Sequence, residues 1–383
     1  MDPNRVRTPH ILITGGGTGG HLFPGIAVAR EFLARDPESR ILFVGTGKAI
    51  ETEVLAREGF EHRVISARGF KGMGLFGKLS ALMTVPRGIA SAWEILKSFA
   101  PDLVVGVGGY SAGPVAAAAW MQGIPVVLHE QNAVPGLTNR TLSRIARRIY
   151  VSLPESAQGF PPDKVLITGN PVRPELLRAT GVDTAEERVF TILVAGGSQG
   201  AKAINRAVVD LLPLLDWPNR VRFLHQTGLA DEAEVREAYR DAGIQAVTGA
   251  FFTDMGQKYR RSDLVICRAG ATTVAELTCL GKPAIFIPYP FAADNHQEKN
   301  ALGLVRAGAA EMIRESDLSP GLLAERIRDY RKHPEKLNAM AGKAGALGRP
   351  DAANVIVTDC LRLIWGVDPP ADSEGLPSST SLD

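Results

Sequence analysis

The stretch ILITGGGTGGHLFPG, residues 11–25, decides the fold class of this chain. Its first four residues are apolar or β-branched, which predicts a short buried strand from Ile11 to Thr14. Glycines follow at 15–17 and 19–20, and the pattern of residues 23–34 then predicts a helix. A strand that passes through a glycine-rich turn into a helix is typical of a Rossmann-like α/β domain with a parallel sheet.

The same unit occurs again in the second half of the chain, where residues 192–200 read ILVAGGSQG. In the first half, a strand at 102–105 leads through glycines to GIPVV at 123–127. In the second half, a strand at 263–266 leads through Gly270 to GKPAI at 281–285. This internal repeat predicts two Rossmann-like domains that face each other, with ligands between the carboxyl ends of their strands.

The repeat also suggests where the domains end. We expect an N-terminal domain at residues 1–175 and a C-terminal domain at residues 176–345. A C-terminal helix within 346–367 is expected to pack back on the first domain. The Pro- and Ser-rich residues 368–383 are expected to be a disordered tail.

Composition limits the class of protein. The 383 residues are 45% hydrophobic and 22% charged, which is ordinary globular composition and excludes disorder as a whole. The formal net charge of +2 does not argue for nucleic acid. Three cysteines without zinc-ribbon spacing indicate free thiols in a reducing compartment, and no metal site is expected. The uncharged stretch 103–128 is broken by glycines and prolines, so we interpret it as strand, loop, helix and strand rather than a membrane span.

Three glycine loops are candidate anion sites. Gly15, Gly17 and Gly20 match the spacing of the dinucleotide fingerprint, but the next strand, 41–44, ends without the acid that a nicotinamide enzyme needs. Glycines before a helix still allow backbone N–H groups to approach an anion. With further loops at 108–113 and 196–200, the chain is expected to handle two phosphate-bearing ligands. The alternative is that these loops are only tight turns.

Two titratable residues are candidates for chemistry. His21 follows the first glycine loop at a helix start, where a neutral imidazole can take a proton from a hydroxyl nucleophile. The alternative is that it only caps or packs the helix. Glu276 begins a helix in the second half, where it could accept ribose hydroxyls or serve as a first-turn acid favoured by the helix dipole. The cluster 129–132 follows a buried strand and is expected at the same crevice.

A basic and apolar segment runs from Arg63 to Trp93, with five bases and no acids. Apolar residues among cations suit the interface of an anionic membrane, although a solvated face is the alternative. The spacing of Arg140, Arg144, Arg147 and Arg148 predicts one shared helix face. Nucleic-acid binding is disfavoured because no stacking aromatics accompany these bases.

At this point the motifs resemble a known family, the MurG N-acetylglucosaminyltransferases of peptidoglycan synthesis. The resemblance covers about Ile11 to Ile364, with the motifs in family order. They are GGTGGHLFPG at 16–25, HEQN at 129–132, GLTN at 136–139, GNPVR at 169–173, GGSQG at 196–200 and CRAGATT at 267–273. The resemblance implies the GT-B fold and an inverting transferase without a metal or other cofactor. It implies UDP-N-acetylglucosamine (UDP-GlcNAc) as donor, undecaprenyl-pyrophosphoryl-MurNAc-pentapeptide (lipid I) as acceptor, and lipid II as product.

The resemblance also implies roles for individual residues. His21 would be the general base, and Arg173 and Ser198 would hold the diphosphate. Phe252 would contact uracil through its backbone and Glu276 the ribose. The remaining donor contacts would be Thr18, Gly19, Gly20, Asn132, Ala271, Thr272, Thr273, Val274, Ala275 and Gln297. The expected acceptor-pyrophosphate contacts are Gly16, Gly17, Gly109, Tyr110 and Ser111. The sequence departs from the family at His296-Gln297, where two adjacent glutamines are common.

The resemblance implies a peripheral enzyme on the cytoplasmic face of the inner membrane, with other cell-wall synthesis proteins as partners. It implies that the N-terminal domain, residues 1–175, lies on the acceptor and membrane side, and that the C-terminal domain, residues 176–345, binds UDP-GlcNAc. Two alternatives stay open at this stage. One is another UDP-sugar enzyme of the same fold, such as an epimerase or a glycolipid glycosyltransferase. The other is a non-catalytic nucleotide-binding or membrane-adaptor protein.

Overall fold

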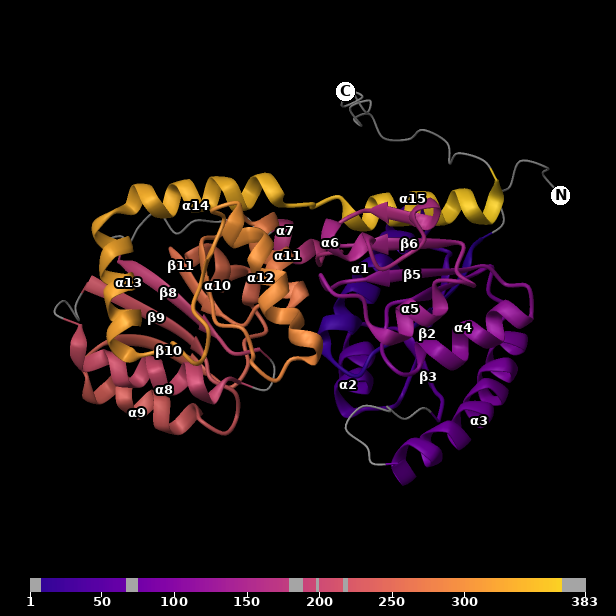
Figure 1. Cartoon of the computed structure of the whole chain (residues 1–383), viewed down its shortest axis with the longest axis horizontal. Helices are drawn as coiled ribbons and strands as arrows, with labels where there is room; N and C mark the ends of the chain where they lie inside the picture. Colours follow the sequence, from indigo (N-terminus) through magenta and orange to yellow (C-terminus); the bar gives the residue numbers. More distant parts are fainter. Residues whose placement is uncertain (1–7, 67–74, 179–188, 198–199, 216–219, 367–383) are drawn as a thin grey trace.

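A computed structural model describes residues 8–66, 75–178, 189–197, 200–215 and 220–366. The side chains of residues 75–85 are also outside the description. The described chain forms two α/β units side by side, each built on its own parallel sheet (Figure 1).

The sheet of the N-terminal unit has seven parallel strands in the order β3-β2-β1-β4-β5-β6-β7. The third strand in this order, β1, places Ile11 beside Ile41 on one side and Leu103 on the other. The strands are β1 (His10–Thr14), β2 (Arg40–Gly45), β3 (Glu61–Val64), β4 (Leu103–Gly106), β5 (Val126–Glu130), β6 (Arg148–Val151) and β7 (Val165–Ile167).

The sheet of the C-terminal unit repeats this order over six parallel strands, β10-β9-β8-β11-β12-β13. The strands are β8 (Phe190–Ala195), β9 (Val221–Gln226), β10 (Gln245–Gly249), β11 (Leu264–Cys267), β12 (Ala284–Phe286) and β13 (Glu311–Met312). The predicted pair of Rossmann-like domains is therefore confirmed. In each sheet the strand order reverses beside the first strand, so β1 and β4, and likewise β8 and β11, flank a switch point where ligands bind in such folds.

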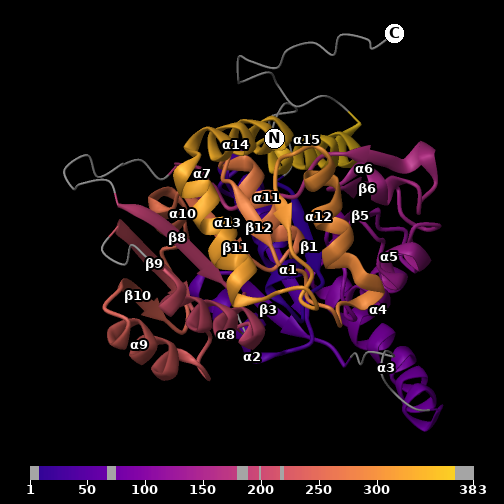
Figure 2. The same cartoon turned by 60° about the vertical axis from the view of Figure 1, so that its left-hand side comes forward.

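Helices cover both faces of each sheet (Figures 1 and 2). In the N-terminal unit they are α1 (Gly19–Arg35), α2 (Ala49–Arg57), α3 (Leu75–Phe99), α4 (Ala112–Met121), α5 (Leu137–Leu142) and α6 (Pro154–Ala157). After α7 (Pro174–Arg178) come α8 (Lys202–Leu211), α9 (Glu232–Asp241), α10 (Met255–Arg261), α11 (Ala271–Cys279), α12 (His296–Arg306), α13 (Pro320–Lys332), α14 (Pro334–Leu347) and α15 (Ala352–Trp365).

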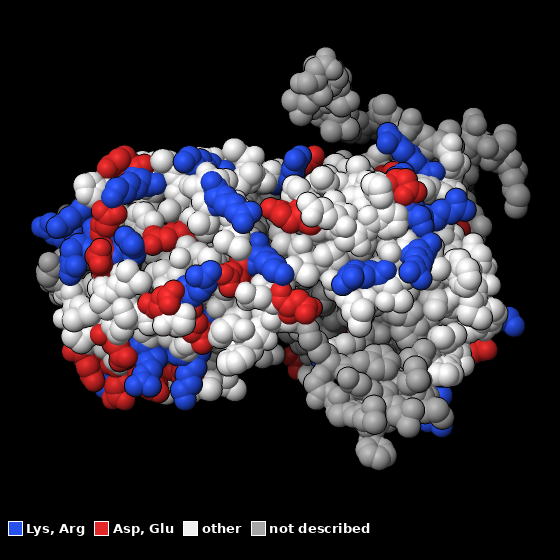
Figure 3. Space-filling view, viewed as in Figure 1, with Lys and Arg blue, Asp and Glu red and all other residues white. Residues whose placement is uncertain are grey.

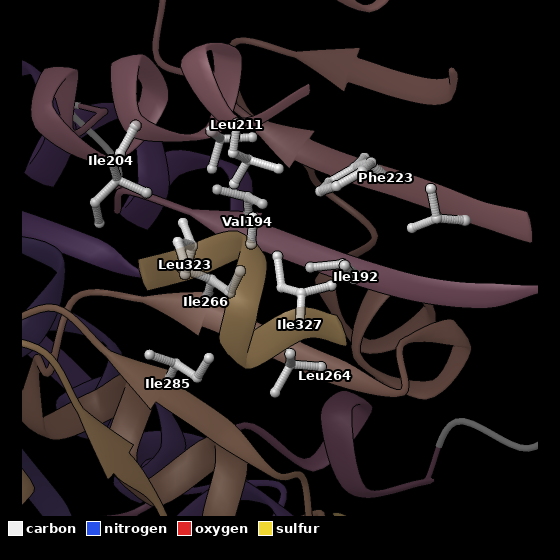
Figure 4. Packing of buried hydrophobic residues seen from close by; sticks show 14 of the residues in the cluster. Ile192, Val194, Ile204, Leu211, Phe223, Leu264, Ile266, Ile285, Leu323 and Ile327 are labelled. Atoms are coloured by element: carbon white, nitrogen blue, oxygen red, sulfur yellow. The ribbon is translucent and has the colours of Figure 1, made fainter. Parts of the chain in front are cut away.

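Each sheet face carries its own apolar core. Figure 4 shows one of them, where Ile192 and Val194 of β8 pack with Ile204 of α8 and Ile327 of α13, all of them 0% exposed. Such full burial of branched aliphatic side chains is the main stabilising contribution to the unit, at about 1.5–3 kcal/mol for each side chain.

The last helix returns to the N-terminal unit. After α14 on the C-terminal unit, the chain crosses over and α15 lies along α1 (Figure 1). Ile356 and Cys360 of α15 are buried in the same core as Ile11 of β1. Asp359 accepts hydrogen bonds from Arg148 at 2.9 Å and from Tyr150 at 3.0 Å, which anchors α15 to β6.

Two sequence expectations need correction. The first helix begins at Gly19 rather than Phe23, because the N–H groups of His21 and Leu22 both donate to the Thr18 carbonyl. The four arginines from 140 to 148 do not share a helix face. α5 ends at Leu142, the N–H of Ala146 closes a turn onto the Leu142 carbonyl, and Arg148 already belongs to β6.

Candidate active site between the two domains

The first two glycine loops of the N-terminal unit pack backbone against backbone. Gly15 has φ +136°, and a Cβ there would lie 2.3 Å from the Gly108 carbonyl oxygen. A Cβ on Gly109 would likewise lie 2.7 Å from the Gly16 carbonyl oxygen. Only glycine permits this approach, so the turns after β1 and β4 form one surface at the switch point.

A buried carboxylate fixes the first loop. Glu51 of α2 is 1% exposed and accepts hydrogen bonds from the N–H groups of Gly17 at 2.5 Å, Thr46 at 2.8 Å and Gly47 at 2.9 Å. Hydrogen bonds to an ionised acceptor are among the stronger ones in proteins. The N–H of Gly17, which was expected to meet an anionic ligand, therefore already donates to the chain's own carboxylate.

His21 lies at this surface, in the first turn of α1, with its tautomer fixed by Gln131. The Gln131 Nε2 donates to the Val107 carbonyl at 2.9 Å, and a carbonyl can only accept. The Gln131 Oε1 therefore faces His21, whose Nδ1 lies 3.0 Å away and must donate. This arrangement leaves the Nε2 of His21 as the basic nitrogen, which is the state that a general base requires.

His129 stands behind Gln131 as a neutral, buried group. Burial lowers the pKa of His129 to about 4, while its bond to the Gly169 carbonyl opposes the shift and the neighbouring His21 adds to it. Its Nδ1 lies 3.0 Å from the Gln131 Nε2, and its Nε2 lies 3.3 Å from the Gly169 carbonyl oxygen. A neutral His129 that accepts from Gln131 keeps this amide in the orientation that His21 needs.

The loop after β5 is held by hydrogen bonds within the N-terminal unit and to the C-terminal unit. Glu130 accepts from the N–H groups of Asn132 at 3.1 Å and Gly136 at 2.9 Å. Asn300 of α12 donates to the Asn132 side chain at 3.2 Å and accepts from the Ala133 N–H at 2.8 Å. Asn300 also donates to the Ala269 carbonyl at 3.1 Å, so one buried amide ties the two units together.

Arg173 and Glu276 meet on the C-terminal side of the cleft. Their closest nitrogen and oxygen lie 3.5 Å apart, and the Arg173 guanidinium lies 4.5 Å from the Phe23 ring centre. The Tyr259 hydroxyl donates to Glu276 at 2.9 Å. Burial raises the pKa of Glu276, and the nearby Arg173 and the Tyr259 hydroxyl lower it in part. The two residues expected to hold a diphosphate and a ribose are thus paired with each other in this state.

Four helix N-termini around the switch points favour anions. The first turns of α1, α4, α8 and α11 contain no acidic residue. Their positive ends are therefore left for a ligand's negative charge. The N-terminus of α11 also contacts the N-terminal unit directly, since the Thr272 hydroxyl donates to the Gly20 carbonyl at 3.3 Å.

These observations can now be set beside known proteins. Residues 11–151 match the glycosyltransferase family 28 N-terminal domain, and residues 191–356 match the glycosyltransferase family 28 C-terminal domain. A Myxococcus xanthus protein named UDP-N-acetylglucosamine–N-acetylmuramyl-(pentapeptide) pyrophosphoryl-undecaprenol N-acetylglucosamine transferase is 46% identical over 361 residues, 93% of this chain and 94% of that protein. The chain belongs to the MurG family of glycosyltransferases.

Further similarities agree with this assignment. The protein of the same name from Geobacter sulfurreducens is 48% identical over 92% of this chain and 98% of its own length. The crystal structure of Acinetobacter baumannii MurG matches with a TM-score of 0.75 and 32% identity, covering 93% of this chain and 99% of that chain. A UDP-GlcNAc 2-epimerase from Neisseria meningitidis matches with a TM-score of 0.67 at 17% identity, which shows the shared fold alone.

The structure gives local contacts for other residues that the MurG resemblance singled out. Thr18 is exposed as the N-cap residue of α1, and Gly19 and Gly20 form the first helical turn. The Phe252 N–H donates to Gln226 at 2.9 Å, which leaves only its carbonyl for a ligand. Gln297 accepts from the Tyr289 N–H at 2.9 Å. Ser198 lies outside the described residues.

The second glycine loop presents Tyr110 and Ser111 at the start of α4. Tyr110 is 46% exposed, whereas Ser111 is fully buried, and its hydroxyl has no hydrogen-bond partner among the described residues. On α11, Ala271, Val274 and Glu276 are buried and Thr272, Thr273 and Ala275 are partly exposed.

Sequence reasoning missed Glu51, Asn300 and Tyr259 as parts of this site. Each is a polar side chain that is buried or nearly so, but its partners come from other elements, as with Glu51 and Gly17, 34 positions apart. A buried acid within a short helix has no local signature that distinguishes it from an exposed one.

In the described part of the chain, no group of three or more His, Cys, Asp or Glu is placed to hold a metal. Among the helices searched there, none combines the length and apolarity needed to span a membrane.

Proposed function

We propose that this chain transfers GlcNAc from UDP-GlcNAc to the C4 hydroxyl of MurNAc in lipid I and so forms lipid II. Relatives that are named as the N-acetylglucosamine transferase of this reaction match more than nine tenths of the chain. The observation that carries the chemistry is the pairing of His21 with Gln131, which leaves a basic Nε2 at the switch point of the N-terminal sheet.

The reaction is a single displacement with inversion. The MurNAc C4 oxygen forms a bond to the anomeric carbon of GlcNAc while the bond from that carbon to the UDP oxygen breaks. His21 Nε2 takes the hydroxyl proton, and UDP leaves with the electron pair of the broken bond. A positioned general base typically contributes about 100- to 10,000-fold to such a rate. The neighbouring helix N-termini would stabilise the developing charge on the diphosphate.

The donor would occupy the C-terminal side of the cleft. We assign Arg173 and Ser198 to the diphosphate, Glu276 to the ribose and the Phe252 carbonyl to uracil. Because Arg173 and Glu276 pair with each other at 3.5 Å, donor binding would part them and give each a ligand partner. The remaining donor contacts assigned are Thr18, Gly19, Gly20, Asn132, Ala271, Thr272, Thr273, Val274, Ala275 and Gln297.

The acceptor pyrophosphate would meet the paired glycine loops of the N-terminal unit. We assign Gly16, Gly109, Tyr110 and Ser111 to this contact on the MurG resemblance, supported by the 46% exposure of Tyr110 beside the α4 N-terminus. Gly17 was also expected to contact the pyrophosphate, but its N–H donates to Glu51, so we assign it to holding the loop in place.

A lipid-linked acceptor requires the enzyme to work at a membrane surface. We propose peripheral binding to the cytoplasmic face of the inner membrane through the N-terminal unit, where other cell-wall enzymes would also meet it. Arg87, Arg140, Arg144 and Arg147 of this unit are exposed. Figure 3 shows basic side chains scattered over this half with fewer acidic ones, whereas the other half mixes both signs. Most of the basic segment 63–93 lies outside the described side chains.

The direct test is a transfer assay with labelled UDP-GlcNAc and a lipid I analogue in detergent, with a chelator present. Label in the lipid product supports the proposal and shows that no added divalent metal is needed. Binding of UDP-GlcNAc without transfer would favour the epimerase or adaptor alternatives. In that case, release of UDP-ManNAc would identify an epimerase.

A further inference from the structure

Arg173 lies on the segment that connects the two units, between β7 and α7. Its neighbour Val172 is buried in an apolar core of the C-terminal unit, and the Leu176 N–H donates to the Arg173 carbonyl at 3.0 Å. These contacts hold the backbone at Arg173. The side chain is long and has many rotamers, so the place of its guanidinium depends on what the side chain itself contacts.

Hydrogen bonds to the described residues hold this guanidinium only weakly. Its Nη2 lies 3.5 Å from a Glu276 oxygen, which is long for a hydrogen bond, and its Nε is buried without a hydrogen-bond partner among those residues. If Glu276 binds the ribose of a donor, even this pair is lost. In that state a contact of another kind is needed to keep the cation in the cleft.

The Phe23 ring of α1 supplies such a contact. The guanidinium carbon of Arg173 lies 4.5 Å from the centre of this ring, within the range of a cation–π interaction. The ring lies against the first turn of its own helix, where a Cβ on Gly19 would be only 3.0 Å from a ring carbon. Glycine at this position therefore leaves the space that the ring occupies.

An aromatic face and a carboxylate hold a guanidinium in different ways. A carboxylate accepts the N–H groups and neutralises the charge, so both are lost to a ligand. A ring below the guanidinium attracts its charge and leaves the N–H groups at its edge for the paired oxygens of a phosphate. The Phe23 contact can therefore persist when the Glu276 contact is exchanged for a ligand.

We propose that Phe23 is a positioning residue for the donor diphosphate, because its ring holds the Arg173 guanidinium in the cleft with and without a ligand. This inference rests on the proposed assignment of Arg173 to the diphosphate. His21 lies two residues before Phe23, in the first turn of the same helix. The helix α1 then sets the positions of both the proposed base and the cation at the leaving group.

The test measures the Kd of UDP by titration calorimetry on the full chain, without a lipid acceptor. Phe23→Leu keeps an apolar side chain but removes the ring, and it should raise the Kd about three- to tenfold. Phe23→Tyr keeps a ring and should stay within about twofold of wild type. The matched control is Phe60→Leu, which should leave the Kd unchanged. The Phe60 ring lies 4.9 Å from the Arg30 guanidinium and packs against the same core as Phe23.

A double-mutant cycle separates positioning from a general structural role. Arg173→Gln should weaken UDP by itself, and Phe23→Leu should then add no further loss, since no guanidinium is left to hold. If Phe23→Leu unfolds by circular dichroism, Phe23→Met takes its place in the cycle.

The outcomes distinguish this inference from the assignment beneath it. If Arg173→Gln weakens UDP but Phe23→Leu does not, the inference is wrong and the diphosphate assignment stands. The inference is equally wrong if Phe23→Leu causes the same loss with and without Arg173. If UDP binds Arg173→Gln as tightly as wild type, the diphosphate assignment fails, and the role of Phe23 fails with it.

Discussion

The Glu51 carboxylate accepts the Gly17 N–H at 2.5 Å, and so a side chain of α2 holds the glycine loop that follows β1. A loop of consecutive glycines is conformationally free in an unconstrained chain, which costs entropy when a ligand orders it. Glu51 fixes this loop before any substrate arrives. Preorganisation of this kind improves binding mostly by reducing the ordering cost.

We therefore predict that Glu51→Gln weakens use of the lipid acceptor. Glutamine offers one acceptor oxygen, and its NH₂ group would face N–H donors that now converge on a carboxylate. The kcat/KM for a lipid I analogue should fall about tenfold or more, whereas the Kd for UDP-GlcNAc should rise less, because Glu51 bonds Gly17 directly and not the assigned donor contacts Thr18 to Gly20. Glu53→Gln, an exposed neighbour on α2, is the matched control. Equal loss for both substrates would point to general unfolding and contradict a role specific to this loop.

For the proposed base, His21→Ala should lower kcat by about 100- to 10,000-fold while UDP-GlcNAc binding persists. Single-turnover transfer and a separate binding titration distinguish the two effects. Gln131→Leu should give a smaller loss of kcat, because the imidazole remains but its tautomer is no longer fixed. His333→Ala, on the exposed end of α13, should match wild type. Transfer by His21→Ala within a few-fold of wild type would remove His21 from this role.

Acid should destabilise the protein below about pH 6.5. Burial lowers the pKa of His129 to about 4 and that of His225 to about 3. Between these values and 6.5 the unfolded chain binds more protons than the folded one, so the free energy of unfolding falls as pH falls. The shift corresponds to about 3 kcal/mol for His129 and about 5 kcal/mol for His225. Urea unfolding across this window should show a shallower pH slope for His225→Gln, and an unchanged slope would contradict burial as the cause.

The buried amide between the units should matter for stability and turnover together. Asn300→Leu leaves the Ala133 N–H and the Ala269 carbonyl without their present partner, at a cost of about 1–3 kcal/mol. We expect a lower unfolding temperature and a reduced kcat/KM, measured by calorimetry and the transfer assay. Lys299→Leu changes the exposed neighbour on the same helix and should alter neither. An unchanged unfolding temperature for Asn300→Leu would mean that the link adds nothing.

The fold could be predicted from sequence because its signals are local and occur twice. The strand at 11–14 and its glycine turn repeat at 192–197, and each forms the third strand of its sheet, beside the point where the strand order reverses. His21 could be singled out by its place after the first turn. The orientation of its ring could not be predicted, because it is set by Gln131, which lies 110 positions away in the sequence. The orientation of the Gln131 amide is in turn set by the Val107 carbonyl. Contacts of this kind arise from the packed sheet rather than from any pattern along the chain.

The position of α15 has a consequence for biosynthesis. Its residues Ile356 and Cys360 complete the core around β1, although they follow the whole C-terminal sheet in the sequence. We therefore expect the N-terminal unit, which is translated first, to keep part of its apolar surface uncovered until α15 has been made. The core of the C-terminal unit does not depend on α15, so we expect this unit to reach its native packing first. Domains that fold during synthesis usually do so from the N-terminus onward, and here that order would be reversed.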